Sequence, residues 1–183
     1  MAVKFSRQWA MPNKETFSVS CIGDFVRRYV RGVVVDPFAR NSRFAVYAND
    51  LNPKTDCAYH MDAVDFLRHM KATGVVADTV LFDPPYSPRQ ISECYSEAGL
   101  SAGMADTQSA RFKREVRNAV RAILPVGGVF LSFGWNSVGP GPDFELLEVL
   151  LVCHGGDHND TICSAWLRTT EQLDLMESTH ATP

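Results

Sequence analysis

The stretch VLFDPPYSPRQ, Val80 to Gln90, joins an apolar run to an aspartate, two prolines and a tyrosine. The apolar residues predict a buried strand over Thr79–Phe82, and Asp83 would follow at its carboxyl end. In open α/β sheets, ligands bind beyond the carboxyl ends of the strands. This stretch therefore predicts both a fold class and the position of a site.

The whole chain has the size and composition of one domain. It has 183 residues, 45% of them hydrophobic, which is enough for one core and too few to expect two. A net charge of −3 argues against tight nucleic-acid binding by bulk electrostatics, although a local basic patch is compatible with it. Five scattered cysteines without a CxxC pair indicate reduced thiols. No membrane span or signal peptide is recognisable, so we expect a cytoplasmic protein with no membrane contact.

Apolar segments alternate with helical patterns along the chain, which predicts an α/β fold with a mainly parallel sheet and helices on both faces. Four strands are each followed by an aspartate: Val33–Val35, Phe44–Asn49, His60–Met61 and Thr79–Phe82. Three more complete a seven-stranded sheet, the last two as an antiparallel hairpin at its edge: Val129–Phe133, Leu147–Cys153 and Thr161–Leu167.

Two helical patterns and one long loop lie between these strands. One helix is expected after Asp62 and a second over Thr107–Leu124. The polar residues 87–106 predict a lid loop with one helical turn near Ile91–Ser96. Residues 170–183 are expected to fray. We see no linker and no separate target-recognition domain, so residues 1–183 are predicted to form a single domain.

The aspartates after the four strands should line one crevice at the sheet's carboxyl edge: Asp36, Asp50, Asp62 and Asp83. Any one of them could instead only cap a following helix, since aspartate is a favoured N-cap residue. A phosphate-bearing dinucleotide is disfavoured, because carboxylates repel phosphate and the chain has neither GxGxxG nor GxxxxGKS. Ribose hydroxyls, an adenine amino group, an ammonium and a sulfonium all suit carboxylates, and together they describe S-adenosylmethionine.

Four ordered motifs resemble those of the S-adenosylmethionine-dependent adenine-N6 DNA methyltransferases, the DPPY amino methyltransferases: VVVDPFARNSRF (33–44), YANDLNP (47–53), HMDAVDFL (60–67) and LFDPPYS (81–87). The similarity runs from about Trp9 to Trp166 and is greatest to a compact, phage-type branch. It implies a Rossmann-like class I methyltransferase fold. The chain departs from the family's DPFxGSG at DPFARNS, where Arg40 and Asn41 replace expected residues, glycine among them.

The resemblance also implies a cofactor site. The methionine part would lie over the first motif, the ribose hydroxyls would bind after the second, and the adenine amino group would meet the third. The residues so implied are Asp36, Pro37, Phe38, Ala39, Asp50, Leu51, Asp62 and Ala63. The N-terminal segment, residues 1–20, would close over the cofactor through Trp9 and Phe17, although both could equally be ordinary packing residues.

The DPPY motif, Asp83 to Tyr86, suits methyl transfer to an exocyclic amine. The lone pair of such a nitrogen is delocalised into the ring and must be directed at the methyl group. Asp83 and the Pro84 carbonyl would accept its N–H groups and stabilise the charge that develops. Pro84 and Pro85 stiffen the turn, and Tyr86 offers a face to a base removed from its stack. The motif alone would suit cytosine N4 as well; the adenine assignment comes from the resemblance.

Substrate contacts are expected from Ser87, Arg89, Trp135 and Asn136, although the last two could be plain packing residues. The helix face with Arg114, Arg117 and Arg121 is more typical of a solvated surface. Four residues invite a zinc hypothesis, but their spacing fits no common ligand pattern and no metal is predicted: Cys153, His154, His158 and Cys163.

The sequence therefore predicts methyl transfer from S-adenosylmethionine to adenine N6 in DNA. Two alternatives stay open: adenine methylation in RNA, and a cofactor-binding subunit without activity, which the altered DPFARNS loop would suit. No predicted loop is large enough to read several base pairs, so we expect a short or relaxed sequence preference. A homodimer or a separate recognition partner could supply further contacts.

Overall fold

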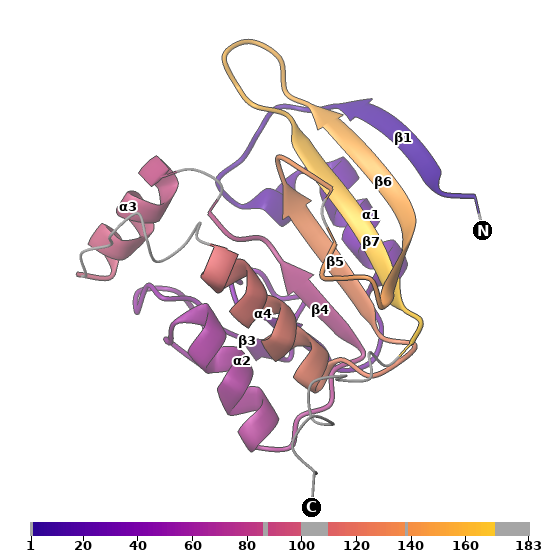
Figure 1. The fold of residues 1–183 in the computed structure, drawn as a ribbon. Coiled ribbons are helices and arrows are strands. Elements are labelled where there is room, and N and C mark those ends of the chain that lie inside the picture. Colours follow the sequence, from indigo (N-terminus) through magenta and orange to yellow (C-terminus); the bar gives the residue numbers. More distant parts are fainter. Residues whose placement is uncertain (1, 86–87, 100–109, 138, 171–183) are drawn as a thin grey trace, which may run out of the picture.

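One seven-stranded sheet forms the centre of the protein in a computed structural model that describes residues 2–85, 88–99, 110–137 and 139–170 (Figure 1). Its strand order is β1-β6-β7-β5-β4-β2-β3. The strands are β1 (Lys4–Trp9), β2 (Val34–Asp36), β3 (Tyr47–Ala48), β4 (Thr79–Phe82), β5 (Val129–Gly134), β6 (Phe144–Cys153) and β7 (Thr161–Arg168). Only β7 runs antiparallel to its neighbours, β5 and β6. The predicted α/β architecture, its mainly parallel sheet and its hairpin are confirmed.

Helices cover both faces of this sheet. They are α1 (Ser20–Tyr29), α2 (Ala63–Ala72), α3 (Pro88–Glu97) and α4 (Ala110–Ile123), with a short 3-10 turn over Thr16–Ser18. On one face, Phe25 of α1 packs into an apolar cluster with Leu131 of β5. On the other, Leu67 of α2 and Val120 of α4 share a cluster with Val80 of β4. In Figure 1, α2 and α4 lie together in front of the sheet and α1 lies behind it.

Two details of the predicted sheet are wrong. His60–Met61 is not a strand; its neighbour Tyr59 forms only an isolated parallel bridge with Asn49. The seventh strand is instead β1, which pairs in parallel with β6, so the hairpin does not form the edge of the sheet. The six residues KFSRQW of β1 are largely exposed, and the strand therefore lacks the apolar pattern that marks buried strands.

The predicted lid loop also contains more regular structure than expected. Residues Pro88–Glu97 form the ten-residue helix α3, in place of the single turn near Ile91–Ser96. Proline favours the first position of a helix, and the Arg89 guanidinium lies 2.8 Å from the Glu93 carboxylate one turn later. Residues 100–109 and the tail from residue 171 lie outside the described residues. No helix in the described ranges is both long and apolar enough to cross a membrane.

Candidate active site

A buried asparagine, Asn49, holds together the loops that follow β2 and β3. Its side-chain amide donates to the carbonyls of Pro37 and Met61, each at 3.0 Å, and its amide oxygen accepts from the Met61 backbone N–H at 2.9 Å. Its backbone bonds to Asp36 and Ala39. Because both polar atoms of its side chain are used, Asn49 holds together the two loops that carry Asp36, Asp50 and Asp62. Sequence reasoning missed this residue.

Asp36 ends β2 as a fully buried carboxyl group. Its Oδ1 accepts from the Phe38 backbone N–H at 2.9 Å, whereas Oδ2 has no hydrogen-bond partner among the described residues. Burial raises the pKa of Asp36 well above its usual value, and the nearby carboxylates of Asp83 and Asp50 raise it further. Burial thus disfavours the ionised form of Asp36, and its hydrogen bond to the Phe38 backbone helps to hold the loop that follows β2.

The two other aspartates of this region bind backbone. Asp50 accepts from the backbone N–H groups of Arg40 at 3.1 Å and Asn52 at 2.9 Å. Asp62 is the N-cap of α2, since its Oδ1 accepts from the Val64 N–H at 2.9 Å. Each also has capacity for a further hydrogen bond, because a carboxylate offers about four acceptor sites.

Asp83 follows β4 and lines two cavities at this end of the sheet. It forms a side-chain hydrogen bond with Thr16, and the Arg40 guanidinium lies close enough to stabilise its charge. Desolvation is larger than both effects and raises the pKa of Asp83 to about 7. A carboxyl group that titrates near neutrality beside a cavity is a common feature of catalytic sites.

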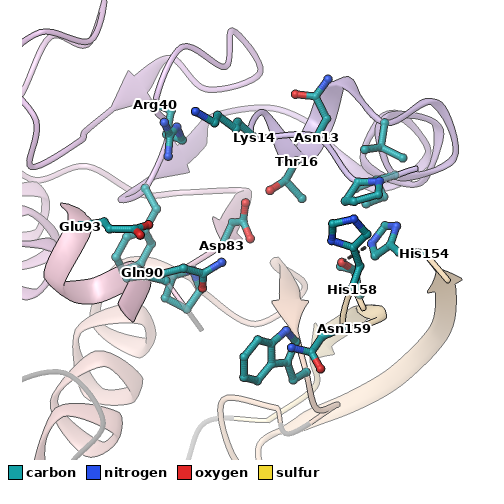
Figure 2. Close-up of a pocket in the computed structure, with 18 of the residues that line it drawn as sticks. Asn13, Lys14, Thr16, Arg40, Asp83, Gln90, Glu93, His154, His158 and Asn159 are labelled. Carbon is teal, nitrogen blue, oxygen red and sulfur yellow. Dashed lines mark hydrogen bonds between the residues drawn. The ribbon is translucent and has the colours of Figure 1, made fainter. Parts of the chain in front are cut away.

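Two cavities meet at this residue. The larger is a cleft of about 620 Å³ and the smaller, of about 350 Å³, lies between the 15–18 segment and the 38–44 loop. Four side chains line both cavities: Thr16, Phe38, Arg40 and Asp83. Figure 2 shows Asp83 near the centre of the larger cleft, with Arg40 and Thr16 above it. A molecule bound in one cavity would thus meet a molecule bound in the other at Asp83.

Three segments enclose the larger cleft. The segment after β1 contributes Asn13 and Lys14, and α3 contributes Arg89 and Gln90 on another side. The β6–β7 loop, residues 154–160, supplies His158 opposite α3 (Figure 2). Sequence reasoning missed Thr16, Lys14 and His158, because isolated polar residues in turns show no pattern before the fold brings them together.

The predicted site residues differ in how they relate to the two cavities. Phe17 and Ala39 line the smaller cavity, and Phe38 and Asp83 line both; the larger cavity is also lined by Pro84, Pro85, Arg89 and Trp135. Seven predicted residues line neither cavity: Asp36, Pro37, Asp50, Leu51, Asp62, Ala63 and Asn136. Trp9 is 67% exposed on β1, at the opposite edge of the sheet from β3, so it is not brought to the other cofactor candidates. Tyr86 and Ser87 lie outside the described residues.

Arg40, which stands where the resembled DPFxGSG motif has a glycine, adopts a backbone conformation that glycine allows. Its φ is +48°, the left-handed region, which few residues other than glycine adopt. A glycine could therefore take the same conformation without strain. The Arg40 side chain enters the space between the two cavities, which a glycine would leave open.

The His154 ring, in the loop between β6 and β7, has a hydrogen-bond contact at each of its nitrogens. The His154 ring lies 2.6 Å from the Ala10 carbonyl through Nδ1 and 2.9 Å from the Thr161 hydroxyl through Nε2, so both nitrogens are engaged. Within the described ranges, no three His, Cys, Asp or Glu side chains gather closely enough to hold a metal ion.

Comparison with solved structures shows where this architecture occurs elsewhere. TrmN from Thermus thermophilus superposes with a TM-score of 0.52 at 16% identity, covering 82% of this chain and 49% of that one. A candidate methyltransferase from Escherichia coli, yhhF, gives a TM-score of 0.50 at 12% identity and covers 82% of this chain and 85% of its own. The fold is that of class I methyltransferases. This chain thus spans about half the length of TrmN. No protein-family model matches the chain, and comparison with curated proteins found no relative.

Proposed function

We propose that this chain transfers a methyl group from S-adenosylmethionine to the N6 amino group of adenine in DNA. The observation that carries the proposal is the position of Asp83, which follows β4 in the sequence DPPY and lines both cavities. One cavity would hold the methyl donor and the other the base. The class I fold and the ordered motifs support the same assignment.

The smaller cavity has the polar groups that the cofactor requires. Arg40 Nε is a buried donor without a hydrogen-bond partner in the described residues, and the Glu15 carboxylate lies 3.7 Å from it in the same cavity. Phe17 and Phe38 supply apolar surface. We assign the methionine half of S-adenosylmethionine to this cavity and its nucleoside half to the loop of Asp50. When bound, the cofactor supplies an electrophilic methyl group on sulfur.

Asp83 and Pro84 would act on the base. Asp83 in its ionised form accepts one N–H of adenine N6, and the Pro84 carbonyl accepts the other, so that the nitrogen lone pair points out of the ring plane. Both acceptors stabilise the positive charge that develops on N6. Asp83 can also take the proton that N6 loses after transfer, because its pKa of about 7 lies near physiological pH.

The larger cleft would hold the extruded adenine. Trp135 lines it and is 44% exposed, so its ring offers a stacking face worth roughly 1–3 kcal/mol to a base. Lys14 and Arg89 at the same cleft would contact phosphates of the flanking strand. The chemistry of these groups suits an adenine in DNA or RNA, and DNA is favoured by the motif resemblance.

A methylation assay tests this function. Purified protein would be incubated with S-adenosylmethionine and duplex DNA, single-stranded DNA or RNA, and the nucleosides analysed for N6-methyladenine by mass spectrometry. We expect methylation of DNA, and none with Asp83→Asn. Methylation of RNA alone would support the RNA alternative. Cofactor binding without any methylation would indicate the non-catalytic subunit.

The sequence preference should be short or relaxed. In the described part of the chain, α3 and the 154–160 loop border the cleft, and both offer few side chains for reading several base pairs in the major groove. Mapping methylated adenines in a random DNA library would measure this preference. A strict motif of five or more base pairs, obtained with this chain alone, would contradict it.

A further inference from the structure

We infer that Arg40 and Glu15 form a two-point clamp for the zwitterionic amino-acid part of the cofactor, with Arg40 binding the carboxylate and Glu15 the ammonium. The inference rests on the cofactor cavity proposed above. It concerns the feature by which this chain departs from its family, the arginine in a glycine position. A glycine there could offer only backbone.

Several observations place opposite charges on this cavity. Arg40 Nε and Glu15 Oε1 are 3.7 Å apart, too far for a hydrogen bond, and Glu15 also accepts from the Asn41 amide at 3.3 Å. Both charged side chains are partly open, with 42% and 38% of their surfaces exposed. They line the same cavity as Asp83, where the methyl group must be presented.

The charges fit an α-amino acid better than they fit each other. Arg40 Nε is buried without a hydrogen-bond partner among the described residues, which is a costly state for a guanidinium donor. A planar guanidinium can bind a carboxylate through two parallel hydrogen bonds, so an incoming carboxylate would satisfy it. The ammonium of the same amino acid would meet Glu15. The carboxylate and the ammonium are bonded to one carbon atom, so they lie side by side, as Arg40 and Glu15 do.

The left-handed backbone at Arg40 supports a role for its side chain. A residue other than glycine at φ +48° is strained, and this strain persists only where the surroundings hold it. The Arg40 backbone N–H donates to the Asp50 carboxylate at 3.1 Å. The residue that would contact the ribose therefore also holds the backbone from which the Arg40 side chain extends. Glycine would give the same turn without strain, and the arginine is therefore present for its guanidinium.

The test compares two ligands that differ only in the amino-acid part. S-adenosylhomocysteine carries it, whereas 5′-methylthioadenosine keeps the nucleoside and sulfur and lacks it. Binding of each is measured by calorimetry for wild type, Arg40→Ala, Arg40→Gly and Glu15→Gln. Arg27→Ala serves as the control, since it removes an arginine from an exposed ion pair on α1.

We expect each Arg40 variant to lose about tenfold or more in affinity for S-adenosylhomocysteine and to bind 5′-methylthioadenosine as wild type does. Glu15→Gln should show the same selectivity with a smaller loss. Arg40→Gly should also melt at a higher temperature than Arg40→Ala, because only glycine is unstrained at this φ.

Two results would overturn the clamp. One is unchanged S-adenosylhomocysteine affinity in Arg40→Gly, which would show that the guanidinium contributes nothing. The other is an equal loss for both ligands, which would indicate a collapsed cavity. Wild-type protein that binds neither ligand would instead refute the cofactor site itself, and a failure of DNA methylation with intact selective binding would refute only the proposed substrate.

Discussion

Asp36 and Asp83 end neighbouring parallel strands, β2 and β4, and yet they face different surroundings. Asp36 is fully buried beneath the loop that Asn49 holds, whereas Asp83 lines both cavities. Asp62, within the third motif, caps a helix. An aspartate after a strand is thus one sequence pattern with two physical outcomes. Where backbone N–H groups are near, the carboxylate organises the loop. Two prolines, which have no N–H, follow Asp83, and its carboxylate lines the cavities instead.

The largest expected effect is on turnover at Asp83. Asp83→Ala should lower the methylation rate by about 100-fold or more, because removing one preorganised transition-state acceptor typically costs 10²–10³. Affinity for S-adenosylhomocysteine should change little, since the acceptor acts on the substrate amine. Single-turnover methylation and calorimetry measure the two quantities, with Asp65→Asn, a change to an exposed side chain on α2, as the control. Turnover close to wild type would show that another group holds the amine.

At Asp50, unlike Asp83, the expected effect is on affinity for the cofactor. Asp50→Ala is expected to weaken S-adenosylhomocysteine binding by about 1.5–3 kcal/mol, the range for hydrogen bonds to charged groups. The loss should be equal for 5′-methylthioadenosine, because both ligands carry the ribose hydroxyls. Asp50 also holds the Arg40 and Asn52 backbone, so thermal melting must accompany the calorimetry. Unchanged affinity in a folded variant would contradict the ribose assignment.

The raised pKa of Asp83 should make the stability of the protein depend on pH. The folded protein raises the pKa of Asp83 to about 7, from about 3.8. Between these values the folded state retains a proton that the unfolded state has lost, so stability falls as pH rises through this window. Asp83→Asn cannot ionise and should escape this loss. Its stability advantage over wild type should grow by about 2 kcal/mol between pH 5 and pH 8.

Urea unfolding at several pH values measures this advantage. A constant difference between Asp83→Asn and wild type would mean that Asp83 is ionised in the folded protein at both pH values. A growing difference would show that the folded protein raises the pKa of Asp83 above its value in the unfolded chain, as burial beside the cavities requires.

Most strands of the sheet could be predicted because they depend on local patterns. Buried strands such as Thr79–Phe82 are apolar without interruption, and a strand followed by Asp-Pro-Pro gives a defined site at the sheet edge. The same reasoning failed for β1, an edge strand whose residues are mostly exposed. It also failed for His60–Met61, where the Met61 backbone bonds to the Asn49 side chain instead of a neighbouring strand.

Much of the candidate site could not be predicted, because it depends on contacts between distant segments. Thr16 meets Asp83, 67 residues later, only after β1 and α1 are placed on the sheet. His158 reaches the cleft because the β6–β7 loop extends over the same end (Figure 1). Arg40 was noticeable in the sequence because the resembled motif has a glycine at this position. Its φ of +48° was needed to show that the arginine adopts a left-handed conformation there.

The smallest expected effect concerns Asp62, where two roles can be separated. Asp62→Ala removes the N-cap of α2 and should lower the free energy of unfolding by about 1 kcal/mol. Asp62→Ser keeps an oxygen for the Val64 N–H, so its stability should remain within a few tenths of a kcal/mol of wild type. If the adenine amino group of the cofactor binds the second carboxylate oxygen, the serine variant will still lose affinity for S-adenosylhomocysteine. If Asp62 only caps the helix, the serine variant will match wild type in both denaturation and calorimetry, and Asp62 will join Asp36 among the carboxylates that build the loop rather than bind through it.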